Sequence, residues 1–172
     1  VLYNANKYGQ PLGYNYENVW RLAFGWQELS DSTLSDVLAR SHQAVLQHDE
    51  VVAASRSTGN TPYAQYTISW DVNHGDRRTN SAFISADAHY PDVLDMEIRE
   101  GRWFEAADAA TADRVVVINR QAREELFGEE PALGKTILFN GDETRPWKVI
   151  GVTGNFKTKG EYPAEGPAIF LN

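Results

Sequence analysis

The chain has 172 residues, of which 42% are hydrophobic and 23% charged, and its formal net charge is −8. This length suffices for one well-formed core or two small lobes, and the composition is that of an ordinary folded domain. The acidic excess argues against binding to nucleic acid or to an anionic membrane surface, and the absence of cysteine excludes disulfides, thiol chemistry and cysteine-based zinc sites.

The N-terminal part of the chain begins with residues 1–16, which are rich in Tyr, Asn and Gly and are expected to form a loosely ordered lead-in. Large apolar residues then alternate over Val19–Trp26, a pattern that predicts a β-strand.

The chain starts at Val1, shows no signal peptide and has no apolar run near the length of about 18 residues that spans a bilayer. We therefore expect a soluble fragment of a longer protein.

A helix and a second strand are predicted next. Polar residues at 30–32 are N-cap candidates, and apolar residues at helical spacing predict a helix from Leu34 to about Gln47. Glu50–Ser57 is expected to be a strand that ends at the turn-forming residues 59–62. Together these elements predict a strand–helix–strand unit over about residues 18–58.

The following zone is rich in β-structure. Tyr63–Trp70 alternates in the manner of a half-buried strand, with its even-numbered residues (Ala64, Tyr66, Ile68 and Trp70) on the buried face. A turn at 73–76 predicts a hairpin with Thr79–Ala86. Asp87–Leu94 is predicted to be a short helix capped by Asp87.

The next segment predicts an irregular strand over Met96–Phe104, interrupted by Gly101, and then a loop over 106–112. The cluster Gly101-Arg102-Trp103-Phe104 could supply aromatic anchors for a partner. We favour a structural role, in which the two aromatic residues are buried and Arg102 pairs with Asp108.

The region from residue 115 onward has the strongest local signals. Val115–Ile118 is a β-branched run that predicts a strand buried on both faces. Asn119 is expected to cap a helix over Arg120–Phe127, with Ala122 and Leu126 on one face and Gly128 as the left-handed residue after it.

Two further strands are predicted at 136–139 and 147–153, joined by a loop that contains Asn140 and Gly141, and a last strand at Ala168–Leu171. The sequence from Gly128 to Gly134-Lys135-Thr136 superficially resembles a phosphate-binding loop. Five residues separate the two glycines where that loop requires four, and a strand follows Lys135 where the loop requires a helix. We therefore predict that this segment does not bind nucleotide.

Candidate metal and catalytic residues do not form convincing sets. Asp87, His89 and Asp92 cannot share one face of a helix or strand, so a helix cap and surface polar residues are the favoured interpretation. His42 and His48 point in different directions on a helix. No nucleophile elbow is present in the sequence, and we predict neither catalysis, nor a metal, nor a cofactor.

A series of short motifs in a fixed order gives a more specific indication. They cover roughly residues 97–158, with weaker support at 9–22, where Pro11 to Trp20 reads PLGYNYENVW. The residues that carry the series are Gly101, Arg102, Phe104, Asp108, Asn119, Ala122, Leu126, Phe127, Gly128, Pro131, Gly134, Lys135, Gly151, Val152 and Phe156. In order and spacing they resemble the MacB-like periplasmic core domain of ABC-transporter permeases of the FtsX-like family.

This resemblance implies an α+β fold with two lobes. An α/β lobe near the membrane would comprise residues 1–58 and be completed by 167–172, and a β-rich distal lobe with short helices would comprise 59–166. Most of the motif residues would be structural. Family members usually continue past the position of Leu171, so the membrane-proximal lobe is expected to be incomplete here.

The resemblance also implies a function: an extracytoplasmic domain, on the periplasmic face of the inner membrane, that couples cytoplasmic ATP hydrolysis to export or to work in the cell envelope without catalysis of its own. Its partners would be flanking transmembrane helices of the same chain, a second copy or half of the permease, a cytoplasmic ATPase and an envelope partner or substrate. A free-standing secreted or periplasmic binding module is the alternative, and an envelope hydrolase is a weaker one.

Overall fold

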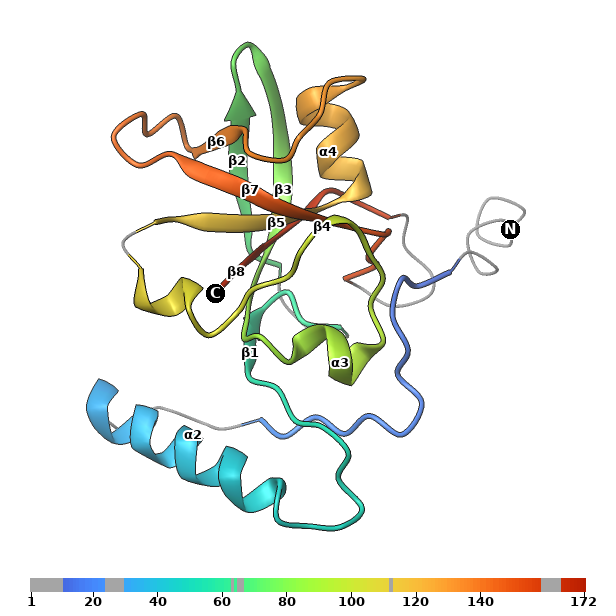
Figure 1. The fold of residues 1–172 in the computed structure, drawn as a ribbon, viewed down its shortest axis with the longest axis vertical. Coiled ribbons are helices and arrows are strands. Elements are labelled where there is room, and N and C mark those ends of the chain that lie inside the picture. The colour runs from blue at the N-terminus through green and yellow to red at the C-terminus, as the bar shows by residue number, and fades with distance from the viewer. Residues whose placement is uncertain (1–10, 24–29, 63, 65–66, 112, 159–164) are drawn as a thin grey trace.

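A computed structural model describes residues 11–23, 30–62, 64, 67–111, 113–158 and 165–172. Its elements are α2 (Asp31–Val45), β1 (Ser57–Gly59), β2 (Ser69–His74), β3 (Arg77–Ala86), α3 (Tyr90–Leu94), β4 (Ile98–Gly101), a 3-10 turn η1 (Asp108–Ala110), β5 (Val115–Asn119), α4 (Arg120–Phe127), β6 (Thr136–Phe139), β7 (Trp147–Thr153) and β8 (Ala168–Leu171). One mixed sheet carries all the strands in these ranges, and α2 stands apart from it (Figure 1). The predicted α+β class is confirmed.

The sheet closes on itself. Its strands follow the order β1-β3-β2-β6-β7-β5-β8, and the additional pairing of β8 with β3 joins the two ends of the β3-to-β8 path into a ring. Strand β8 runs parallel to β3 and antiparallel to β5. Strands β1 and β4 are outside the ring and pair with β3 and β7 respectively.

Two hydrophobic cores lie on opposite faces of the central strands. Strand β5 is buried along its whole length, with Val115 and Val117 in one core and Val116 and Ile118 in the other, which confirms the strand predicted to be buried on both faces. The α3-side core comprises Tyr14, Ile84, Ala86, Tyr90, Leu94, Met96, Trp103, Phe104, Val115, Val117, Phe156, Ala168 and Phe170. The α4-side core comprises Val72, Val116, Ile118, Ala122, Leu126, Phe127, Ala132, Ile137, Phe139, Val149, Val152, Ile169 and Leu171.

Helix α4 forms as the sequence predicts. The side chain of Asn119 accepts a hydrogen bond from the backbone N–H of Ala122 and so caps the helix. Ala122, Leu126 and Phe127 are buried in the α4-side core. Gly128 ends the helix with a φ of +60°, in the positive range that glycine adopts without steric cost.

Two predicted strands are wrong where the structure describes them. Residues 19–23 and 50–56 have no strand structure, although the helix predicted between them is present as α2 with Ser30 as its cap. Trp20 is 90% exposed and Val52 is 98% exposed. An alternating pattern becomes a strand only when a neighbouring strand accepts its hydrogen bonds, and neither segment has one among the described residues. The rest of the first predicted strand, residues 24–26, is outside the described residues.

Three other expectations need correction. The lead-in is ordered where it is described, because Tyr14 is buried and its ring lies 5.1 Å from that of Phe156. Strand β2 begins only at Ser69, and Ile68 is 37% exposed although the alternation predicts it on the buried face. Tyr63 and Tyr66 of the same predicted strand lie outside the described residues.

Helix α3 starts at Tyr90, three residues later than predicted, with His89 in place of Asp87 as its cap. The carboxylate of Asp87 accepts hydrogen bonds from Ser55 and from the backbone N–H groups of Arg56 and of His89, the residue just before α3. The predicted hairpin is confirmed, because β2 and β3 pair in antiparallel register through a turn at Gly75 and Asp76.

The division into two lobes at residues 58 and 59 stays a prediction. Strand β8, which the predicted division assigns to the membrane-proximal lobe, pairs with β3 and β5 from the range assigned to the distal lobe. Among the described residues, no helix combines the length and the apolarity that crossing a membrane requires.

Replacing Leu126 by alanine is expected to lower the free energy of unfolding by about 2–5 kcal/mol, because the side chain is fully buried under α4. Urea unfolding measures the loss. Leu46→Ala is the matched control: the same truncation at a 41% exposed site just after α2 should change stability by no more than about 0.5 kcal/mol. Equal midpoints for Leu126→Ala and the parent would contradict the packing of α4.

Candidate functional site

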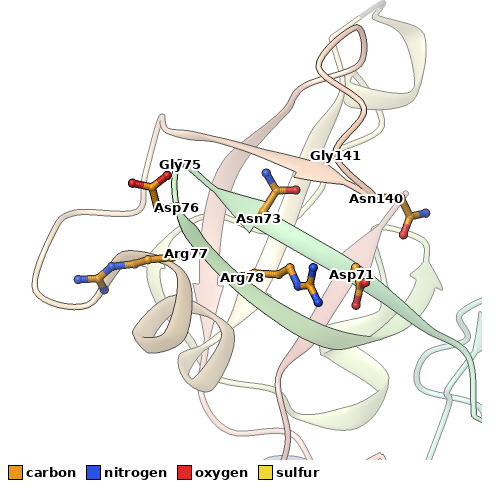
Figure 2. Close-up of a pocket in the computed structure, with 8 residues that line it drawn as sticks. All are labelled: Asp71, Asn73, Gly75, Asp76, Arg77, Arg78, Asn140 and Gly141. Atoms are coloured by element: carbon orange, nitrogen blue, oxygen red, sulfur yellow. The ribbon is translucent and has the colours of Figure 1, made fainter.

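A shallow, open depression of about 430 Å³ lies at the turn of the β2–β3 hairpin. Its lining comes from the hairpin and from the loop after β6, and comprises Asp71, Asn73, Gly75, Asp76, Arg77, Arg78, Asn140 and Gly141 (Figure 2). Asn73 lies opposite Arg78 in the hairpin register, and the backbone N–H of Asn140 donates to the carbonyl of Asp71. The hairpin and this loop lie at the end of the molecule away from α2 (Figure 1).

The chemistry of this depression is hydrogen bonding and charge of both signs. The side chain of Arg78 is directed toward Asp71, whereas Asp76 and Arg77 extend from the turn in another direction (Figure 2). No apolar side chain lines the depression. Sites that bury small molecules are usually enclosed and largely apolar, so this surface suits contact with a polar macromolecule better than capture of a small ligand.

The Gly101-Arg102-Trp103-Phe104 element has the structural role that the sequence favours. Trp103 and Phe104 are buried in the α3-side core, where their rings contact each other. Arg102 binds Asp108 through two hydrogen bonds of 2.6 and 2.8 Å. These bonds, with a further one from the backbone N–H of Glu105, hold the pKa of Asp108 below its ordinary value of 3.8 against the opposing effect of its partial burial.

Glycine is required at two motif positions where β4 crosses β7. Gly101 lies opposite Gly151 in the register of these strands. A Cβ on Gly151 would lie 2.1 Å from the carbonyl oxygen of Arg102, and one on Gly101 would lie 2.2 Å from that of Ile150. Both distances are shorter than van der Waals contact allows, so the two backbones approach this closely only because both residues lack a side chain.

Asn119 is a buried polar residue whose side chain forms hydrogen bonds with three segments of the chain. Its Oδ1 accepts from the backbone N–H groups of Ala122 and Ala168, at 3.0 and 2.9 Å, and its Nδ2 donates to the carbonyl of Gly166. The sequence predicts the first of these contacts. The other two join α4 to the start of β8, and no local pattern could reveal them because they link residues distant in the chain.

The remaining motif residues occupy the interior or the exposed connection after α4. Val152 is in the α4-side core and Phe156 in the α3-side core. A Cβ on Gly128 would clash with the guanidinium of Arg77. Pro131, Gly134 and Lys135 are exposed, and β6 follows Lys135 directly, so the strand predicted after this lysine is confirmed. That these positions form a family motif stays a prediction.

The candidate metal residues are distributed as follows. The carboxylate of Asp87 accepts from Ser55 and from the backbone N–H groups of Arg56 and His89, whereas the exposed imidazole of His89 lies 3.6 Å from the carboxylate of Asp92. His42 makes a 3.0 Å hydrogen bond with the carbonyl of Ala54. Across the described ranges, no three His, Asp or Glu side chains are grouped so that they could hold a metal ion. Sequence reasoning missed the contacts of Asp87, because Ser55 is distant in the chain.

Comparison with known proteins identifies what the whole chain resembles. The family described as the MacB-like periplasmic core domain matches residues 7–172. The chain is 35% identical over 81 residues to the macrolide export ATP-binding/permease protein MacB of Aggregatibacter actinomycetemcomitans, a match that covers 44% of this chain and 12% of that protein. It is 34% identical over 82 residues to the pyoverdine export ATP-binding/permease protein PvdT of Pseudomonas syringae, with 47% and 12% covered. The matched segment is thus a small part of the length of these relatives.

Two solved structures share the fold. The extracellular domain of the noncanonic ABC-type transporter YknZ from Gram-positive bacteria superposes with a TM-score of 0.56 at 21% identity, covering 83% of this chain and 67% of that one. The periplasmic region of MacB from Actinobacillus actinomycetemcomitans gives a TM-score of 0.54 at 22% identity, covering 77% and 53%. At this identity the likeness concerns the fold alone.

Replacing Gly151 by alanine is expected to destabilise the fold by about 1–3 kcal/mol, because the added methyl group overlaps the Arg102 carbonyl and forces β4 away from β7. Thermal or urea unfolding measures the loss. Gly166→Ala is the control, since nothing lies within 4 Å of the place that its methyl group would occupy. A Gly151→Ala variant as stable as Gly166→Ala would refute the close approach of the two strands.

The Arg102–Asp108 pair predicts a pH-dependent contribution to stability. Because the pKa of Asp108 is lowered by folding, its contribution is complete above the ordinary pKa of 3.8 and is lost as the pH falls through the lower, folded value. Asp108→Asn should therefore be less stable than the parent at neutral pH, and the difference should shrink below pH 3.8. Asp113→Asn, at an exposed aspartate in the same connection, should show no such trend. A difference that stays constant with pH would exclude the proposed role of the carboxylate.

Proposed function

Because this chain belongs to the family of MacB-like periplasmic core domains, and is thus the periplasmic domain of a MacB-like ABC-transporter permease, we propose that it passes mechanical work from ATP hydrolysis to the cell envelope. The observation that carries the proposal is the family match over residues 7–172. In this proposal the domain lies on the outer side of the inner membrane, and the movement of the membrane helices displaces it as a body.

The construction of the sheet supports a mechanical role. A ring of strands with a core on each face resists deformation, because bending it would disturb two packed layers at once. A body of this kind can transmit a displacement that originates elsewhere, as a rigid-body transition requires. We infer that the domain itself performs no chemistry and holds no cofactor.

The partners follow from the proposed role. They are the flanking transmembrane helices of the same chain, a second copy or half of the permease, and a cytoplasmic ATPase that acts indirectly. Two copies that carry a net charge of −8 each repel at low salt, so their pairing would depend on tethering by the membrane helices. The polar depression at the β2–β3 hairpin is the surface we propose for an envelope partner.

The alternative is a free-standing secreted or periplasmic binding module. Reading the open reading frame on both sides of the chain distinguishes it from the permease. Apolar helices of about 20 residues flanking the domain support the permease. A cleavable signal peptide before residue 1 and a stop codon directly after the domain would support the binding module.

The proposal predicts that the domain moves relative to the bilayer when ATP is consumed. A donor dye at position 143, introduced as Glu143→Cys in the exposed β6–β7 loop, would be combined with acceptor-labelled lipid head groups in vesicles that contain the whole permease. Energy transfer is expected to change on addition of ATP and to stay constant when the ATPase is inactivated. Constant transfer during ongoing hydrolysis would overturn the proposal.

A further inference from the structure

We propose that Asp87 and helix α3 form a junction through which displacements pass between the sheet and the α2 segment, defined as the described residues 20–23 and 30–54. That the junction exists is argued from contacts in the structure. That it transmits movement rests on the proposed function. The residues that make it are Asn15, Ser55, Arg56, Asp87, Leu94 and Trp103.

The carboxylate of Asp87 binds the chain where it leaves the α2 segment. Ser55 Oγ donates to Oδ1 at 2.6 Å, and the backbone N–H of Arg56 donates to Oδ2 at 2.8 Å. The backbone N–H of Asp87 returns a hydrogen bond to the carbonyl of Arg56 at 3.1 Å. The Asp87 side chain is only 19% exposed, so these charge-assisted bonds are largely shielded from competing water.

The backbone of Asp87 is tied to the α3-side core. Its carbonyl accepts a 3.0 Å hydrogen bond from the indole N–H of Trp103, which is 8% exposed and packs against Phe170 of β8. The same carbonyl accepts from the N–H of Tyr90 at the start of α3. The carboxylate of Asp87 therefore binds the chain just after the α2 segment and the backbone N–H of His89 before α3, while its carbonyl binds the core of the sheet.

The other end of the α2 segment meets the opposite end of α3. The backbone N–H of Asn15 donates to the carbonyl of Leu94 at 2.7 Å, and Val19 packs against the α3-side core. The chain thus enters the α2 segment beside the last residue of α3 and leaves it beside Asp87, just before the helix. Figure 1 shows α3 between α2 and the sheet.

Among the described residues, the chain on either side of α2 is held at these two places. No residue of α2 belongs to either core, and α2 makes no extensive contact with any strand or helix in the described part of the chain. Its last turn is bound to the chain that follows it by the hydrogen bond between His42 and the carbonyl of Ala54, next to Ser55. Within the described residues on that side, a displacement of α2 therefore reaches Ser55, Arg56 and Asp87 first, and then β1, which pairs with β3 from Ser57 onward.

The test measures the width of the distance distribution between α2 and the sheet. Gln43 on α2 and Lys148 on β7 are exposed, and the chain has no cysteine of its own, so Gln43→Cys and Lys148→Cys give one defined pair of spin labels. In the whole permease, diluted with an excess of unlabelled copies, with cysteines outside residues 1–172 replaced by serine and without nucleotide, the parent should give one narrow distance distribution. Asp87→Ala should broaden this distribution, because Ser55 and Arg56 lose the carboxylate that binds them.

Ser55→Ala and Asp92→Asn complete the experiment. Ser55→Ala removes one of the same bonds from the other side without disturbing the start of α3, and should broaden the distribution less than Asp87→Ala does. Asp92→Asn removes a charge from α3 at a site that pairs with exposed His89, and should leave the distance distribution narrow. A narrow distribution in Asp87→Ala, or an equally broad one in Asp92→Asn, would overturn the junction.

Energy transfer from position 143 then separates this inference from the proposed function. If the parent responds to ATP and Asp87→Ala does not, while hydrolysis continues in both, the junction carries the movement. If both respond equally, the junction does not transmit it. If the parent itself does not respond, the proposed function fails, whereas the distance measurement still decides whether the junction exists.

Discussion

The side chain of Asn119 is fully buried, and its amide satisfies three backbone groups that belong to different segments. It caps α4, it accepts from the first residue of β8, and it holds the turn that leads into β8. A buried N–H or carbonyl without a partner costs about 1–3 kcal/mol, so an apolar residue here would leave several such groups unsatisfied at once. The position of α4 over one core, and of β8 between β3 and β5, both depend on this single amide.

The sheet is held by contacts on several sides, whereas helix α2 is held by few contacts. In the sheet, β5 and β8 have neighbours on both edges and cores on both faces, so each residue is fixed from several directions. Helix α2 instead relies on the contacts around Asp87 and Asn15. Stability is therefore expected to vary along the chain, with the highest local values in the ring and lower values in α2.

The parts of the fold that could be predicted are those with strong local signals. The run of β-branched residues at 115–118, the cap at Asn119 and the pairing of Arg102 with Asp108 all involve residues close in the sequence. The strands expected at 19–26 and 50–57 were predicted from an apolar pattern alone. Such a pattern does not show whether a neighbouring strand is available to pair with it. Asp87 accepts from the backbone N–H of nearby His89, but its other partners, Ser55 and Arg56, lie 32 and 31 positions away.

The closure of the ring by β8 has a consequence for how the protein is made. The β2–β3 hairpin needs only residues close in the chain, whereas Ala82 of β3 pairs with Ala168, far downstream. Until β8 has been synthesised, β3 and β5 each lack a neighbour and the valines of β5 have incomplete cover on both faces. Parallel pairing between such distant segments is slow to form, and uncovered strand edges associate with other chains. The nascent chain therefore passes through an interval in which a holding chaperone would protect it from aggregation, and this interval ends only with the last strand.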